Sequence, residues 1–141
     1  MSAERVIAEI SSGESGFRVC MPARSVLILE LTGNISEELG LQFVEALDHA
    51  LRQSPGLLTV FADLRKMEGY RPSLRLQLVA TFLAHSDLVP SIHAYAHEEF
   101  SLILMAVAVA NIALGERITM HPEWADFERR LKRAIEASEG W

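Results

Sequence analysis

The sequence predicts a single α/β domain with a mixed, mostly parallel sheet of about five strands and four helices. Three observations support this fold class. First, 141 residues suffice for one domain and are too few for two ordinary ones. Second, 50% of the residues are hydrophobic and 23% are charged, which is typical of a packed globular chain. Third, short apolar runs alternate with segments of helical periodicity, so successive strands should pair in parallel through right-handed crossovers.

Two strands joined by a polar loop are expected first, and they should form an antiparallel edge of the sheet. Residues 6–10 and 17–21 each follow the period-two alternation of a strand. Between them, residues 11–16 (SSGESG) consist mostly of turn-forming residues. Residues 26–31 (VLILEL) then form a third strand, and their nearly unbroken apolar run indicates burial on both faces.

Residues 32–34 should end that strand and lead into the first helix. Asn34 and Glu37 fit a capping box, with Ser36 as an alternative N-cap. The helix carries an apolar residue at every fourth position: Leu39, Phe43, Leu47 and Leu51. It should end before Pro55. Residues 57–64 (LLTVFADL) form the next buried strand, which we expect beside residues 26–31 in the centre of the sheet.

The second half of the chain continues the alternation of strands and helices. A loop over residues 65–71 leads to Pro72, which suits the first turn of a mostly buried helix. Four elements follow: a strand at 92–96, a helix at about 99–114, a short strand at 117–120 and a helix opening at Pro122. We expect three regions: a strand and loop extension (1–16), the domain itself (17–137) and a tail (138–141).

Three segments of the chain resemble the STAS domain (sulphate transporter and anti-sigma factor antagonist), in particular its bacterial SpoIIAA-like branch. They are residues 26–33 (VLILELTG), 57–64 (LLTVFADL) and 63–70 (DLRKMEGY). In the third, an Asp-Leu-Arg is followed by an apolar residue and a Gly-aromatic pair. The order of elements over residues 17–135 is similar as well.

The resemblance implies a non-catalytic regulatory or protein-interaction module. This branch is also similar to the SEC14/CRAL-TRIO lipid-binding fold, which implies an alternative: a carrier or sensor of a small apolar ligand, such as a lipid or fatty acid. Phosphorylated anti-sigma antagonists carry an Asp-Ser-Ser-Gly-type loop where the second helix begins. Here the corresponding stretch reads GYRPSL, without the acid or the glycine. Ser73 is therefore interpreted as an ordinary first-turn serine, with phosphorylation as the alternative.

The loop over residues 65–73 is the first candidate binding site. It follows the carboxyl end of a strand, where ligands bind in α/β folds, and leads into a helix N-terminus. Its candidate binding residues are Arg65, Lys66, Tyr70, Arg71 and Ser73. We expect them to contact an anion or an unknown regulatory protein partner; the alternative is a solvated connector.

The apolar helix at residues 99–114 is the second candidate. Its polar residues, Glu99, Ser101 and Asn111, share no face. Four apolar side chains on one side should face the core: Phe100, Ile103, Val107 and Leu114. Four on the other side have no evident cover: Leu102, Met105, Val109 and Ile112. We expect this second stripe to form a homodimer interface. The alternatives are that residues 6–10 fold over it or that a lipid covers it.

Several functional classes are disfavoured. No nucleophile elbow, phosphate loop or other catalytic motif is present, and neither a cofactor nor a metal is expected. His93 and His97 would lie about 13 Å apart on a strand, too far to share a metal ion. A net charge of −6 disfavours nucleic-acid binding. A membrane span needs about 20 apolar residues, longer than any run here. Glu4 and Glu9 interrupt any signal-peptide pattern, and the lone Cys20 forms no internal disulfide, so a cytoplasmic location is expected.

Overall fold

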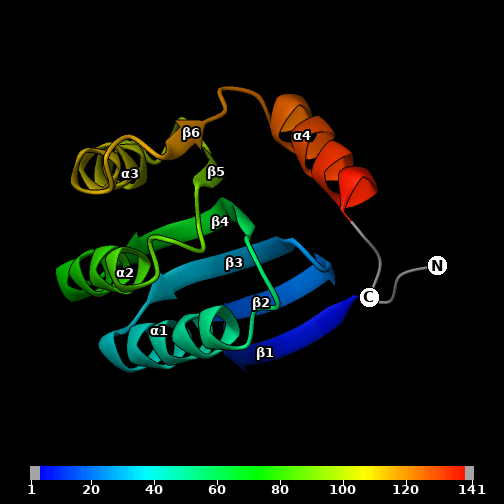
Figure 1. Cartoon of the computed structure of the whole chain (residues 1–141). Coiled ribbons are helices and arrows are strands. Elements are labelled where there is room, and N and C mark those ends of the chain that lie inside the picture. The colour runs from blue at the N-terminus through cyan, green and yellow to red at the C-terminus, as the bar shows by residue number, and fades with distance from the viewer. Residues whose placement is uncertain (1–3, 139–141) are drawn as a thin grey trace.

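A six-stranded mixed sheet lies at the centre of the molecule, with its strands in sequence order from β1 to β6 (Figure 1). The computed structural model describes residues 4–138. The strands are β1 (Arg5–Ser12), β2 (Ser15–Ala23), β3 (Val26–Ile35), β4 (Thr59–Tyr70), β5 (Ser91–Ala96) and β6 (Ile118–Met120). The pairs β1–β2 and β2–β3 are antiparallel and the remaining pairs are parallel, which confirms the predicted fold class.

Helices cover both faces of this sheet (Figure 1). They are α1 (Glu37–Arg52), α2 (Pro72–Ala84), α3 (Ser101–Ala113) and α4 (Trp124–Ala137). Helices α1, α2 and α3 lie on one face, and α4 lies alone on the other. The core is therefore split into two clusters by the sheet, because successive strand residues point to opposite faces.

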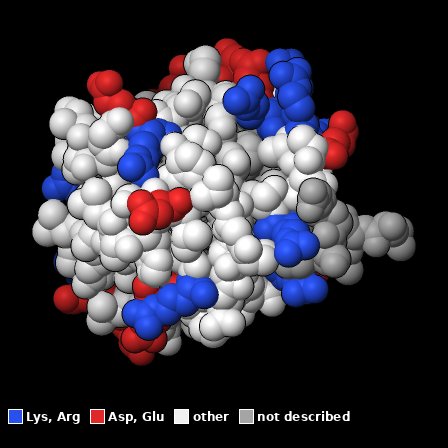
Figure 2. Space-filling view, viewed as in Figure 1, with Lys and Arg blue, Asp and Glu red and all other residues white. Residues whose placement is uncertain are grey.

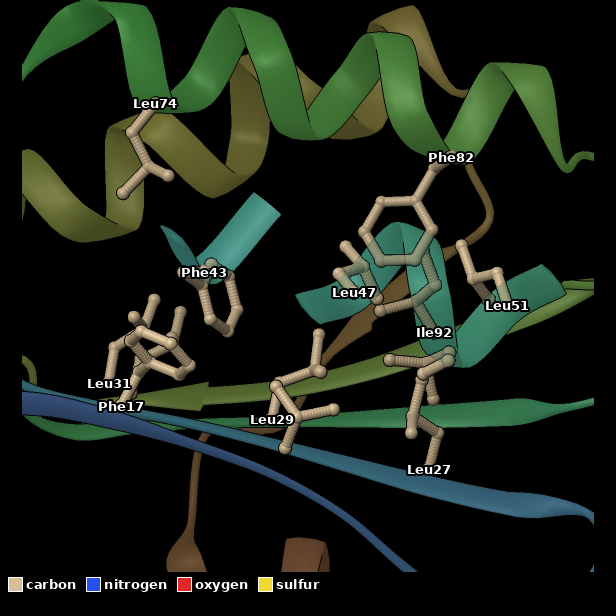
Figure 3. Close-up of a cluster of buried hydrophobic side chains, with 14 of the residues drawn as sticks. Phe17, Leu27, Leu29, Leu31, Phe43, Leu47, Leu51, Leu74, Phe82 and Ile92 are labelled. Atoms are coloured by element: carbon tan, nitrogen blue, oxygen red, sulfur yellow. The ribbon is translucent and has the colours of Figure 1, made fainter. Parts of the chain in front are cut away.

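The larger cluster fills the space between the sheet and α1, α2 and α3. Figure 3 shows Leu74 and Phe82 of α2 directed toward strand residues that include Leu29. The smaller cluster, under α4, includes Val26 of β3, Phe61 of β4 and Phe127 of α4. Strands β3 and β4 contribute buried side chains to both clusters and are adjacent, as their apolar runs predicted.

Both central strands extend further than expected. The predicted break at residues 32–34 and the predicted loop at residues 65–71 are wrong, because β3 and β4 stay paired as far as Ile35 and Tyr70. Two register shifts allow this extension. Gly33 has a φ of 74°, and a Cβ there would lie 2.6 Å from the carbonyl oxygen of Glu14. Polar side chains do not end a strand whose backbone groups remain paired.

Three further expectations concern two of the helices and the edge strand. Ser36, not Asn34, is the N-cap of α1, since its hydroxyl accepts a hydrogen bond from the Leu39 N–H. Helix α2 is less buried than predicted, because Leu76 and Leu83 are exposed. Finally, β1 lies at the sheet edge farthest from β6 and α3, so residues 6–10 do not cover α3 (Figure 1).

The predicted extension and tail fall partly within the described residues. Strand β1 belongs to the extension and pairs along β2 as an edge strand. Of the tail, Ser138 is described, and its hydroxyl accepts a hydrogen bond from the Ser25 N–H. Residues 1–3 and 139–141 lie outside the described residues. The boundaries at 16 and 137 stay predictions.

Candidate functional site

Arg65, the first of the predicted binding residues, is held in place by its own neighbours. Its guanidinium donates hydrogen bonds to both carboxylate oxygens of buried Asp63, at 3.1 and 3.0 Å. Its Cζ atom lies 3.4 Å from the centre of the Trp124 ring, on the α4 side of the sheet. The hydrogen bonds to Asp63 raise the pKa of Arg65. Arg65 of β4 therefore links this strand to α4 through its contact with Trp124.

Of the other four predicted binding residues, Tyr70, Arg71 and Ser73 lie at the start of α2, whereas Lys66 lies within β4 and pairs with Thr32. Lys66 and Arg71 are exposed, whereas Tyr70 and Ser73 are half-buried. Arg71 is the N-cap of α2, and no side chain within residues 4–138 caps this end by a hydrogen bond. Pro72 has no N–H and the Leu74 N–H donates to the Arg71 carbonyl oxygen, so of the first three helical residues only Ser73 can offer its N–H to an anion. The structure thus holds Arg65 against Asp63 and Trp124, leaves Lys66 on β4, and places Tyr70, Arg71 and Ser73 together at the start of α2.

Helix α3 exposes the stripe that the sequence singled out. We call Leu102, Met105, Val109 and Ile112 the α3 stripe. Their exposed fractions are 73%, 63%, 47% and 75%. On the other side of the helix, Ile103 and Leu114 are buried, and Phe100 and Val107 pack against the large cluster. Figure 2 shows largely uncharged surface where α2 and α3 lie, whereas charged side chains gather over α4.

A cavity of about 120 Å³ lies between α2, α3 and the sheet. We call it the apolar cavity. Small alanine side chains from three elements line this space and leave room in it: Ala62 of β4, Ala94 of β5, and Ala106 and Ala110 of α3. Larger apolar side chains also line it, including Phe82 and Ile103. The lining is almost wholly apolar, which suits the apolar part of a small ligand.

Two members of the cavity wall carry polar atoms, Tyr70 and Arg75. Arg75 is half-buried on α2, and its Nε atom is buried without a hydrogen-bond partner in the part of the chain that the structure describes. Sequence reasoning missed this residue. The available signal was a single cation within the otherwise apolar face formed by Leu74, Leu78 and Val79.

A second polar feature lies under α4, on the other face of the sheet. His93 Nδ1 and His121 Nε2 are 2.9 Å apart, so one imidazole donates a hydrogen bond to the other. His93 also stacks on Phe61. Burial, with smaller contributions from His121 and Arg130, lowers the pKa of His93 to about 4. Sequence reasoning missed this pair because 28 positions separate the two residues.

Two further features of residues 4–138 bear on function. None of the helices in that range is long and apolar enough to cross a membrane. The same residues contain no cluster of three or more side chains suited to hold a metal ion.

Comparisons with known proteins identify the fold. No protein-family model and no curated protein matches this chain. Among solved structures, an uncharacterized DUF3478-family protein from Shewanella loihica PV-4 with a SpoIIAA-like fold is 15% identical, with a TM-score of 0.57. That match covers 93% of this chain and 95% of the other. The anti-sigma factor antagonist SpoIIAA in its unphosphorylated form is also 15% identical, with a TM-score of 0.53 over 84% and 97% of the two chains. This chain therefore has a SpoIIAA-like fold, as its sequence resemblance predicted.

Proposed function

We propose that this chain is a non-catalytic regulatory module of the cytoplasm that pairs with a second copy of itself and binds a regulatory protein partner. The SpoIIAA-like fold supports a regulatory role, since one solved protein with this fold is an anti-sigma factor antagonist. The observation that carries the proposal is the α3 stripe, which is apolar, exposed and continuous along one helix face. Contiguous exposed apolar surface of this kind marks interaction sites.

A second copy of the chain is the occupant that fits the α3 stripe. Each side chain of the stripe forgoes roughly 1.5–3 kcal/mol if it stays in water. A two-fold axis beside α3 lets the same four residues cover each other. Ala108 and Ala113 are exposed on the same helix, and their small size lets two copies of α3 approach closely.

The double variant Met105→Glu with Val109→Glu tests this interface. We expect it to elute with the mass of one 15.7 kDa chain, because four buried carboxylates would face each other across the two-fold axis. The matched control is Leu41→Glu with Leu57→Glu, which places the same charges at exposed apolar positions elsewhere. Light scattering gives the mass and circular dichroism verifies folding. A folded stripe variant that keeps the wild-type dimer mass would contradict the proposal.

The partner surface that we propose lies at the start of α2. Arg71 supplies an exposed positive charge at the N-cap of α2, beside Tyr70 and Ser73. Lys66 adds a second exposed charge on β4, four residues before Tyr70. The double variant Lys66→Ala with Arg71→Ala, when immobilised, should retain less of the partner protein than the wild-type chain does. Its melting temperature should equal that of the wild type. Arg24→Ala with Arg133→Ala removes two exposed charges elsewhere and is the control. If both double variants retain the same amount of partner protein, residues 65–73 do not bind the partner and only connect β4 to α2.

The apolar cavity supports a second candidate function, a carrier or sensor of a small apolar ligand. Its wall combines many apolar side chains with only two polar residues, as ligand pockets do. Native mass spectrometry of the purified chain, followed by organic extraction, tests this candidate. A mass above that of the bare chain, released on extraction, is the expected result. A bare chain that also takes up no added apolar compound would exclude the carrier function.

A further inference from the structure

We propose that helix α2 supplies the second part of the interface between two copies of this chain. In this interface, Leu76 and Leu83 of α2 join the α3 stripe in one continuous apolar surface, which we call the α2–α3 face. The inference rests on the self-association proposed above and names a further surface that the second copy covers. It arises from an observation that pairing through α3 alone leaves unexplained: Leu76 and Leu83 are 64% and 51% exposed.

Helices α2 and α3 lack the charged outer face that α4 has. In α4, seven of the fourteen residues are charged. In α2 and α3, with thirteen residues each, Arg75 is the only charged residue. Six of the nine large apolar side chains that are exposed within residues 4–138 lie on these two helices. A helix that is apolar on all sides is normally covered on all sides, so α2 needs an outer cover as α3 does.

The exposed leucines of α2 lie on the side of that helix that faces α3. Val79 lines the apolar cavity, which lies between α2, α3 and the sheet. Leu76 comes three residues before Val79 and Leu83 four residues after it. Residues at these spacings are neighbours on the surface of a helix. The exposed row of α2 therefore follows the edge of the helix that borders α3.

Helix α3 repeats this arrangement from the other side. Ala106 lines the same cavity, and Leu102 and Val109 of the α3 stripe lie four residues before it and three residues after it. The two helices lie next to each other on one face of the sheet (Figure 1). Both exposed rows thus border the same seam and form one surface.

The α3 stripe alone is small for a stable dimer interface. A standard interface takes about 800 Å² from each partner, and about 65% of that area is apolar in homodimers, so each copy should supply about 500 Å² of apolar surface. A fully exposed large apolar side chain offers up to about 120 Å². At their exposed fractions, the four side chains of the α3 stripe offer about 300 Å², and Leu76 and Leu83 raise this to about 450 Å². The α2–α3 face therefore approaches the apolar area of a standard homodimer.

A second copy suits this face better than an unlike protein does. Charged groups are what steer unlike partners to each other and exclude wrong ones, and Arg75 is the only such group on the two helices. A two-fold axis instead places identical apolar rows against each other and needs no matching charge. Permanent homodimer interfaces are accordingly more hydrophobic than transient ones.

The double variant Leu76→Glu with Leu83→Glu tests the part of the interface that α2 supplies. Analytical ultracentrifugation of the full chain over a dilution series measures the dissociation constant of the dimer. We expect an increase of about a hundred-fold or more, because the new carboxylates would lose water without gaining a partner. The milder variant Leu76→Ala with Leu83→Ala removes apolar area only and should give an increase of about ten-fold. Leu41→Glu with Leu57→Glu is the control and should leave the constant unchanged, with circular dichroism to verify folding.

Methyl NMR of the wild-type chain provides a readout that needs no variant. On dilution through the dissociation range, the methyl signals of Leu76 and Leu83 should shift together with those of Val109 and Ile112. The methyl signals of Leu57, which is exposed elsewhere, should stay unchanged.

The outcomes distinguish failure of this inference from failure of self-association. If Met105→Glu with Val109→Glu separates the copies while both α2 variants keep the wild-type dissociation constant, α2 lies outside the interface. That result overturns the inference and leaves self-association through α3 standing, as do unshifted Leu76 and Leu83 signals beside shifting α3 signals. A wild-type chain that stays a monomer at every concentration overturns both.

Discussion

Asp63 is a buried carboxylate, and within residues 4–138 its ion-pair partner is Arg65. The two residues share two side-chain hydrogen bonds, and the Arg65 backbone N–H donates a third to Asp63 Oδ1. Arg65 also stacks on Trp124, so it joins the sheet to α4. In the sequence, Arg65 stands beside Lys66 in a segment that we predicted to be a binding loop. Only the tertiary structure shows that Arg65 instead pairs with Asp63 and Trp124.

The variant Arg65→Ala should therefore destabilise the fold. It leaves Asp63 buried without its charge-assisted partner and removes the contact with Trp124. We expect the free energy of unfolding to fall by about 2 kcal/mol, the usual size for a hydrogen bond to a charged group. Chemical denaturation measures this change. Lys66→Ala, at an exposed position, is the control and should stay within about 0.5 kcal/mol of wild type. An Arg65→Ala variant as stable as this control would show that Asp63 needs no partner.

The paired imidazoles of His93 and His121 should make stability depend on pH. The groups that face them are Arg130, which opposes protonation of both rings, and Asp126, which favours it at His121; burial is the largest effect and lowers both pKa values. An unfolded histidine titrates near 6.5, whereas the pKa of folded His93 lies at about 4. Between these values the unfolded chain binds more protons, so stability falls as the pH falls, and the loss levels off below about 4.

Urea denaturation between pH 7.5 and 5.5 measures this dependence above the range where carboxylates titrate. One such histidine should reduce the free energy of unfolding by about 1 kcal/mol at the lower pH. The variant His93→Gln should flatten the profile, whereas His49→Gln, at an exposed position, should retain it. A flat profile in the wild-type chain would mean that His93 titrates as it does in water.

At the scale of elements, helix α1 illustrates what the sequence determines. Its apolar stripe predicted the helix, but two residues competed to cap it. Ser36 accepts the hydrogen bond from the Leu39 N–H at 3.1 Å, while Asn34 lies one residue before the end of β3. Asn34 and Ser36 both fit the sequence pattern of an N-cap. Because β3 continues to Ile35, Asn34 belongs to the strand and Ser36 caps the helix.

Replacement of each candidate cap tests this assignment. We expect Ser36→Ala to lower the free energy of unfolding by about 1 kcal/mol, the typical value of an N-cap hydrogen bond. Asn34→Ala should have a clearly smaller effect, because Asn34 is exposed and does not cap α1. Thermal denaturation of both variants measures the difference. A larger loss in Asn34→Ala would reverse the assignment.

The sequence predicted the parts of the strands that apolar side chains specify. It did not predict the parts that depend on backbone pairing alone. Apolar runs correctly placed the centres of β3 and β4. Their ends, residues 32–35 and 65–70, are rich in polar residues and glycine, yet they remain paired through two register shifts. Such shifts leave no apolar pattern, because the paired groups are backbone N–H and carbonyl groups.

At the scale of the whole molecule, the sequence predicted an exposed surface better than it predicted interior sites. The α3 stripe followed from helical geometry alone, since no polar face existed to meet water. The apolar cavity and Arg75 depend on how α2 packs against α3, and the His93–His121 pair depends on the neighbouring positions of β5 and β6. Contacts between distant parts of one sequence carry no local signal.

The mass of the wild-type chain in solution tests the central proposal, self-association through α3, most directly. The measurement is light scattering coupled to size exclusion over a series of concentrations into the high micromolar range. We predict a particle of twice 15.7 kDa, with dissociation only on dilution. A particle of 15.7 kDa at every concentration would contradict self-association.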